Sequence, residues 1–398
     1  MIDAYILDGV RSPRARAKAS GALHELTPQA LLAQLYEGLC ARTGLTPARV
    51  DEVILGCVTQ QGEQAANIAR TSLLYAGWPD AVPGLTVQRF CSSSIDAIAL
   101  AALKVNAGQH RFVVAGGVEM MSRTPMLSDK ARIFADPDFA MQCRTPLMGS
   151  GADLIASLED VTREEADGVA LLSQQRAIAA RDDGRFAPSI HPIKTEVGTA
   201  EQDECPRPET SAESLARMAP AFAELGAAGV DAFQSRANPG LREIRHIHTA
   251  GNSPAMADAA CVLLLGPRDM ALPSAKPRAK VAASVTVGAD PLQVLTGCVE
   301  ATEALLERSG LDVADVDLFE IHEAFAATSV LAKRRLGLDN ERLNVNGGCI
   351  ALGHPMGATG AIMTLTLLDE LERRDLQRGV VAAAGAAGSG SALLIERC

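Results

Sequence analysis

The sequence predicts an α/β protein made of two similar halves with a long insertion between them, and three observations support this fold class. Apolar, β-branched runs alternate with Ala- and Leu-rich amphipathic stretches, which is the pattern of buried strands covered by helices. One segment near the N-terminus recurs near residue 300 at a constant offset. The sequence between the two copies is more charged and irregular, as expected of an insertion.

The first half contains helices and strands in a clear order. An amphipathic pattern predicts a helix over residues 28–42, and a short apolar run predicts a buried strand at 53–55. A second strand, residues 84–90, leads through Cys91 into a helix, and a third strand follows at 112–115. After the insertion, an apolar run at residues 261–265 predicts one more strand.

The second half repeats this order, with a predicted helix over residues 291–308 and strands at 316–321 and 380–382. The step from Arg42 to Arg308 (308 − 42 = 266) also aligns six other identical pairs: Glu37 with Glu303, Leu39 with Leu305, Gly44 with Gly310, Leu45 with Leu311, Val50 with Val316 and Asp51 with Asp317. With a shifted offset, residues 85–88 resemble residues 343–346. The duplication predicts two packed α/β halves.

The expected domains follow from the repeat. Residues 1–120 together with 250–272 form the N-terminal half, residues 273–398 form the C-terminal half, and residues 121–249 form a loop domain. Long insertions of this kind usually carry binding functions when they are ordered.

Composition and charge exclude several functional classes. The 398 residues are enough for more than one hydrophobic core. A net charge of −11 and an aromatic content of 3% argue against nucleic-acid binding. Nine cysteines without a CxxC pair are typical of reduced thiols and predict no metal site. The sequence shows neither a signal peptide nor an apolar stretch of about 18 residues, so we expect a cytoplasmic protein without a membrane span.

Cys91 is the first candidate catalytic residue. It lies between an apolar strand and the helix that begins around Ile95. The positive end of a helix favours the thiolate form of a nearby cysteine. The alternative is a buried structural cysteine, which is the commoner fate of a single cysteine.

Two histidines of the second half are further candidates. His354 lies next to Pro355 in the glycine-rich segment 347–357, where glycines allow a close approach to another part of the chain. This segment lacks the GxxxxGK[ST] pattern of a phosphate loop, and no GxGxxG motif opens a βαβ unit near the N-terminus. His322 directly follows the strand predicted at 316–321, although a histidine at a strand end is more often structural than catalytic.

Several motifs together resemble the thiolase superfamily over essentially the whole chain. The segment around Cys91 resembles the nucleophile segment of that family, and residues 116–125 resemble the stretch that follows it. Residues 249–252 together with Asp258 resemble the segment that closes the loop domain. Residues 344–360 are the strongest match.

The resemblance implies a five-layered α-β-α-β-α fold of two duplicated halves with an inserted loop domain. It also implies that Cys91 takes the acyl group of an acyl-CoA or 3-ketoacyl-CoA as a thioester, in thiolytic cleavage or Claisen-type condensation, with His354 as its base. His322 begins a His-Glu-Ala-Phe motif, as in the β subunit of the fatty-acid-oxidation trifunctional complex, and would help to hold the thioester oxygen. The backbone N–H groups of Cys91 and Ala386 would form a second oxyanion hole.

Substrate contacts and partners are likewise implied by the resemblance. Substrate-binding residues are expected at Met148, Asn252, Ser253 and Phe325. Coenzyme A is expected as a substrate, without a permanently bound cofactor. The family implies a homodimer or homotetramer, a role in fatty acid metabolism, and a complex with other acyl-CoA enzymes.

The chain departs from the family pattern at two positions. Thiolases normally carry a second cysteine, an acid/base, in a C-terminal glycine-rich loop, where this sequence has Ala384. A methyl group transfers no proton, and losing a positioned acid/base commonly costs about 10² to 10⁴-fold in rate. Cys349 and Cys398 are candidate substitutes, but neither lies at the family position. Pro254 stands where the family often has a serine near coenzyme A.

Three accounts of Ala384 remain open at this point. The chain is a thiolase inactivated by an engineered cysteine-to-alanine change, or a thiolase-like enzyme of altered chemistry that uses Cys91, His322 and His354 in the manner of ketoacyl-synthase condensing enzymes. The third account is a non-catalytic acyl-CoA-binding partner.

Overall fold

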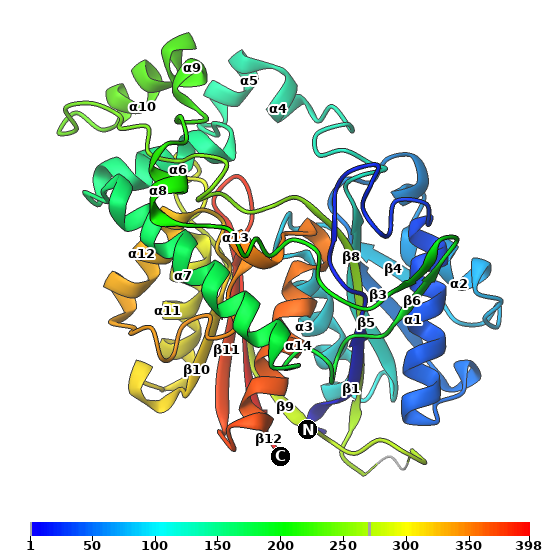
Figure 1. Ribbon diagram of the computed structural model, residues 1–398. Coiled ribbons are helices and arrows are strands. Elements are labelled where there is room, and N and C mark those ends of the chain that lie inside the picture. The colour runs from blue at the N-terminus through cyan, green and yellow to red at the C-terminus, as the bar shows by residue number, and fades with distance from the viewer. Residues whose placement is uncertain (1, 270–271) are drawn as a thin grey trace.

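The computed structural model describes residues 2–269 and 272–398 of the chain (Figure 1). Met1 and residues 270–271, which the expected halves include, lie outside the described residues. The centre of the molecule is a ten-stranded sheet. Its main path runs β10 (Leu318–Ile321), β11 (Arg378–Ala384), β12 (Ser389–Arg397), β9 (Ala279–Gly288), β1 (Ala4–Arg11), β8 (Ala257–Pro267), β5 (Val113–Met120), β3 (Glu52–Gly56) and β4 (Gly84–Val87), and β2 (Ala15–Arg16) pairs with β8.

Strand pairing shows the duplication directly. In the first half β3 is parallel to β5, while β8 is antiparallel to both β5 and β1. In the second half β10 is parallel to β11, while β12 is antiparallel to both β11 and β9. The strands of the first and second halves are called the first and the second sheet below. They join in the ten-stranded sheet where β1 pairs with β9, through Tyr5 opposite Lys280 and Ile6 opposite Ala279. The predicted α/β fold of two similar halves is therefore confirmed.

Helices divide the molecule into layers (Figure 1). The outer face of the first sheet is covered by α1 (Pro28–Thr43) and α2 (Ile68–Tyr75), and the outer face of the second by α11 (Gly297–Ser309) and α12 (Ala326–Leu336). Between the sheets lie α3 (Ser93–Asn106) and α14 (Thr359–Arg373). The core around these two helices includes Ile54 of the first sheet and Val381 of the second. This is the expected α-β-α-β-α order.

The repeat also extends to short elements. The 3-10 turns η1 (Pro47–Arg49) and η4 (Val313–Asp315) follow α1 and α11 in the same way and precede β3 and β10. The helix predicted from residue 291 begins only at Gly297. Val294 adopts a positive φ of 64°, which an α-helix does not tolerate, and its carbonyl accepts a hydrogen bond from Gly388 N at 3.1 Å.

The insertion is more helical than its charged, irregular sequence predicts. Its longest element is α7 (Arg163–Asp182), which begins with a capping box between Thr162 and Glu165. The remaining elements are α4 (Arg132–Ala135), α5 (Pro137–Gln142), α6 (Met148–Leu158), α8 (Ala212–Ala216), α9 (Ala223–Leu225), η3 (Gly226–Val230), α10 (Asp231–Ala237), β6 (Ile193–Thr195) and β7 (Gly198–Ala200).

Within the described residues, no helix is both long and apolar enough to cross a membrane.

Candidate active site

Cys91 lies where β4 leads into α3, at the carboxyl end of a parallel strand pair. The preceding residue, Phe90, has a left-handed backbone with φ 49°, so the chain turns sharply before the helix starts at Ser93. The hydroxyl of Ser92 donates to the carbonyl of Ala383 at 2.7 Å. The turn that carries the thiol is therefore anchored to β11 in the other half.

His354 meets Cys91 from the second half of the chain. Its Nε2 lies 3.0 Å from the Cys91 Sγ, and its Nδ1 lies 2.8 Å from the hydroxyl of Thr359. A thiol donates its proton, so Nε2 is the acceptor and Nδ1 carries the hydrogen that faces Thr359. The backbone N–H of His354 donates to the carbonyl of Ala255 at 2.7 Å, which fixes the turn against the segment that follows the insertion.

The resting pair is neutral. Burial, with a further contribution from the charge of Glu119, raises the pKa of the Cys91 thiol to about 12. Burial and the neighbouring His322 lower the pKa of His354 well below its ordinary value. The expected thiolate at the start of α3 is thus opposed by loss of solvation, because a helix N-terminus contributes only about 1 kcal/mol or less. The proton must move from Cys91 to His354 during attack.

His322 follows β10 and stacks on His354, with ring centroids 4.3 Å apart. Its backbone N–H donates to Ala382 at 2.8 Å. Burial lowers the pKa of its imidazole to about 4, an effect that the nearby backbone of Ala384 partly opposes. Neither ring nitrogen makes a hydrogen bond of normal geometry within the described residues, although His322 is only 1% exposed. The buried ring is therefore neutral, and at least one of its two nitrogens is left without a partner among the described residues.

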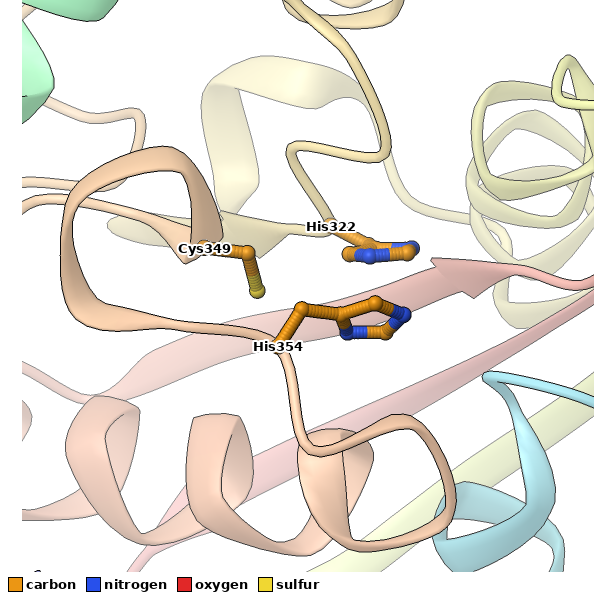
Figure 2. A group of neighbouring side chains, drawn as sticks. All are labelled: His322, Cys349 and His354. Atoms are coloured by element: carbon orange, nitrogen blue, oxygen red, sulfur yellow. The ribbon is translucent and has the colours of Figure 1, made fainter. Parts of the chain in front are cut away.

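Cys349, at the start of α13 (Cys349–Leu352), completes a compact group with the two histidines. Figure 2 shows the two imidazole rings one above the other, with the Cys349 thiol beside them. The three ligand atoms lie within 4.8 Å of one another, so this group could hold a metal ion, which the spacing of cysteines in the sequence does not reveal. A metal bound there would compete for the imidazole that must receive the Cys91 proton.

An apolar cavity of about 370 Å³ opens over the pair. Cys91, His322 and His354 all line it, and so do Met148, Ser253, Phe325 and Ala386 of the predicted site. The described residues of its wall include no lysine or arginine. The large apolar side chains of the wall are Phe90, Met121, Met126, Leu127, Ile133, Phe134, Met148, Phe222, Met256, Leu295, Phe325 and Met356.

Two predicted site residues lie outside this wall. The Asn252 side chain is fully buried, donates to Asp167 and Ile247, and accepts from the backbone of Thr249 at 2.8 Å. These bonds use both N–H donors of its amide within the protein, so neither is left for a substrate. Ala384 is the buried last residue of β11, paired with Gly390 of β12. Pro254, the second departure from the family pattern, does line the cavity.

Glu119 is a residue of the site that the sequence analysis does not single out, although it lies in the segment 116–125 that resembles the family. It lies near the carboxyl end of β5 and is fully buried, and its carboxylate accepts four hydrogen bonds. Its partners are Val58 N (3.0 Å), Thr59 N (3.0 Å), Gln64 Nε2 (2.8 Å) and Gly357 N (2.9 Å). Gly357 belongs to η5 (Met356–Ala358), which directly follows the turn that carries His354. The Glu119 carboxylate therefore connects this turn to the first half through hydrogen bonds.

Comparisons with known proteins identify the family. The model of the thiolase N-terminal domain matches residues 4–232, and that of the thiolase C-terminal domain matches residues 275–397. The duplicated, layered fold with a cysteine and a histidine where the halves meet is that of an acyl-CoA acyltransferase. The chain belongs to the thiolase family.

Similar proteins cover the whole chain. It is 36% identical over 421 residues to a 3-ketoacyl-CoA thiolase of Bacillus subtilis (strain 168), with 100% of both chains covered. It is also 36% identical over 422 residues to the 3-oxoadipyl-CoA/3-oxo-5,6-dehydrosuberyl-CoA thiolase of Escherichia coli (strain K12), again over 100% of both. The crystal structure of Bacillus anthracis acetyl-CoA acetyltransferase superposes with a TM-score of 0.84 at 35% identity, covering 100% of this chain and 99% of that one. The protein is an acetyl-CoA C-acyltransferase-like enzyme, and coenzyme A is its substrate.

Proposed function

We propose that the enzyme transfers acyl groups through a thioester on Cys91, with His354 as the base. The observation that carries the proposal is the 3.0 Å contact between His354 Nε2 and Cys91 Sγ, which two distant segments make at the floor of the cavity. A nucleophile with a base in hydrogen-bonding reach is the arrangement that covalent acyl transfer requires. The base in turn is oriented by Thr359 through its Nδ1.

The charge of the intermediate would be held by backbone donors. Cys91 and Ala386 both line the cavity, and among the described residues neither backbone N–H group donates to another residue. Two free N–H groups beside the thiol can receive the oxygen of a tetrahedral intermediate. Met148, Ser253 and Phe325 would contact the substrate from the wall of the cavity.

The wall favours an apolar acyl chain. Methionine and phenylalanine side chains from the insertion and from both halves are nine of its twelve large apolar side chains, and burying an apolar acyl chain against them contributes about 0.8 kcal/mol per CH₂ group. A carboxylate at the far end of the acyl chain would be buried without a cationic partner, which is costly. We therefore expect neutral acyl-CoA substrates to react faster than dicarboxylic ones of equal length, as in fatty acid metabolism.

Intact-protein mass spectrometry after incubation with an acyl-CoA tests the acyl-enzyme. The expected result is a mass increase of one acyl group that is absent in Cys91→Ser and formed much more slowly in His354→Ala. A binding partner without catalysis, the second candidate, would bind acyl-CoA but give no adduct. No adduct with any neutral chain length, while the protein remains folded, would contradict the proposal.

We also propose a homodimer or homotetramer. The edge strand β4 ends the main path of the sheet, and the neighbouring α2 exposes Leu74 (51%) and Tyr75 (61%). An uncovered edge beside exposed apolar side chains is a template for association. Light scattering should give a mass above one chain, and Leu85→Lys on β4 should lower it. Association with other acyl-CoA enzymes and a cytoplasmic location stay predictions.

A further inference from the structure

A second cavity, of about 270 Å³, is lined by α7, by α12 and by the loop at residues 340–344. The two helices pack side by side (Figure 1), and we call this space the α7–α12 cavity. Among the described residues, none lines both this cavity and the acyl cavity over Cys91. Cavities for drug-sized ligands measure about 300 to 1,000 Å³, so the α7–α12 cavity has room for a smaller molecule.

Two cationic side chains of the α7–α12 cavity have no acidic partner within the described residues. Arg176 is half-buried, and its guanidinium donates to backbone carbonyls of residues 340–344. The ammonium group of Lys333 donates to Asn340 Oδ1 at 2.8 Å. Burial lowers the pKa of Arg176 below its usual value, although a guanidinium stays charged at neutral pH. A partly buried charge without a counter-ion is stabilised by an anion.

The acidic side chains of the wall are already engaged within the protein. Glu165 pairs with Arg334 at 2.7 Å. Glu323 is 4% exposed and accepts from Ser173 Oγ at 2.8 Å and from Ile350 N at 3.1 Å. Because Glu165 matches the charge of Arg334, two cations remain against one buried carboxylate. The excess of one positive charge suits a monoanion better than a phosphate, which carries nearly two negative charges at pH 7.

Ser329 offers the cavity an unused hydrogen-bonding group. It lies on α12, lines the cavity and is only 5% exposed, and its Oγ has no partner among the described residues. A hydroxyl inside a helix usually points to solvent or donates to the carbonyl four residues earlier. A buried polar group without a partner is unfavourable, so a ligand oxygen at this position would satisfy the hydroxyl.

We propose that the α7–α12 cavity binds a small monocarboxylate with an apolar chain of a few carbon atoms. The carboxylate would receive hydrogen bonds from Arg176, Lys333 and the Ser329 hydroxyl. A carboxylate only accepts hydrogen bonds, and it binds cationic donors more strongly than neutral ones. The apolar chain would pack against the apolar side chains of the same wall, which are Val169, Leu172, Val330 and Leu343.

Calorimetric titration of the full chain with hexanoate tests this proposal. We expect saturable binding with a dissociation constant of about 1 mM or lower. Hexylamine has the same chain with the opposite charge, and it should bind at least about tenfold more weakly. Inorganic phosphate tests for a general anion site. It should also bind more weakly than hexanoate, because it carries more charge and has no apolar chain.

Two variants of α12 place the bound hexanoate. Lys333→Met keeps the apolar stem without the charge and should raise the dissociation constant about tenfold or more. Ser329→Ala should raise it about threefold or more, while the unfolding temperature of the free enzyme should not fall, because this hydroxyl has no partner to lose. The matched control is Arg335→Met, which removes a cation that pairs with Glu303 outside the cavity and should leave the dissociation constant unchanged.

Several results would overturn the proposal. They are an absence of hexanoate binding, unchanged affinity in both Lys333→Met and Ser329→Ala, and affinity for hexylamine or phosphate that equals or exceeds that for hexanoate. Hexanoate binding does not require Cys91 to react, so these outcomes are independent of the acyl-enzyme proposed above.

Discussion

Replacing Glu119 with glutamine should destabilise the protein and slow acylation together. The carboxylate receives four N–H groups, two on each oxygen. An amide in either orientation turns its NH₂ group towards two donors, so two hydrogen bonds to a charged group are lost at about 1.5 to 3 kcal/mol each. Gln64 cannot flip to compensate, because its Oε1 accepts from Met120 N at 2.6 Å and its Nε2 also donates to Thr59. The expected loss is about 3 to 6 kcal/mol.

The effect on catalysis follows from Gly357. This residue loses or weakens its bond to Glu119, and the His354 turn shifts relative to Cys91. A displacement of about 1 Å can cost about 10²-fold in rate. Urea denaturation gives the free energy of unfolding, and the rate of acyl-Cys91 formation gives the kinetic effect. Glu63→Gln, which breaks a partly exposed pair with Arg123, is the control and should cost about 1 kcal/mol or less. A Glu119→Gln protein as stable and as fast as the wild type would refute this reasoning.

Three other perturbations have defined outcomes. Gly353→Ala should cut the rate of acyl-Cys91 formation about 10²-fold, because φ is 95° and a Cβ would lie 2.8 Å from the Cys205 sulfur. Gly310→Ala, at another positive φ (64°) but in open space far along the chain from the site, should leave that rate unchanged. Burial lowers the pKa of His322 from 6.5 to about 4 in the folded protein, so the stability that its neutral ring contributes is present above pH 6.5 and is lost as the pH falls towards 4. Urea denaturation at pH 7 and pH 5 should therefore show that the free energy of unfolding falls by about 2 kcal/mol more in the wild type than in His322→Asn. Asp203→Ala should cost about 3 to 5 kcal/mol by thermal or urea unfolding, since it leaves Arg11 buried without its bidentate partner; a loss below about 1 kcal/mol would contradict the buried-pair argument.

The hydrophobic patterns of single helices and strands predicted the fold because the duplication presents each of these patterns twice. The helix at residues 28–42 and the strand at 53–55 are confirmed as α1 and β3, and the shift of 308 − 42 = 266 positions carries η1 onto η4. The charged sequence of the insertion predicts irregular structure where α7 forms, although Thr162 and Glu165 make a capping box, which is a signal that sequence alone can carry. The late start of α11 depends on Val294 and its contact with Gly388, which no local pattern encodes.

The sequence predicted which residues are candidates for the site better than it predicted their protonation states. Sequence indicated Cys91 and both histidines, because each occupies a distinctive turn or strand end. The neutral state of the thiol depends on burial by distant segments and on Glu119, so a helix N-terminus alone gave the opposite expectation. The internal role of Asn252 likewise depends on Asp167, far away in sequence.

The antiparallel contact between β1 and β9 has a consequence for the origin of the molecule. Either half alone would leave one face of its sheet and one central helix without cover, so a one-copy ancestor would have had to associate with a second molecule about a twofold axis. The cysteine and the histidines that now work together come from opposite sides of that axis. Gene fusion would thus have converted the interface between two subunits into the floor of the active-site cavity.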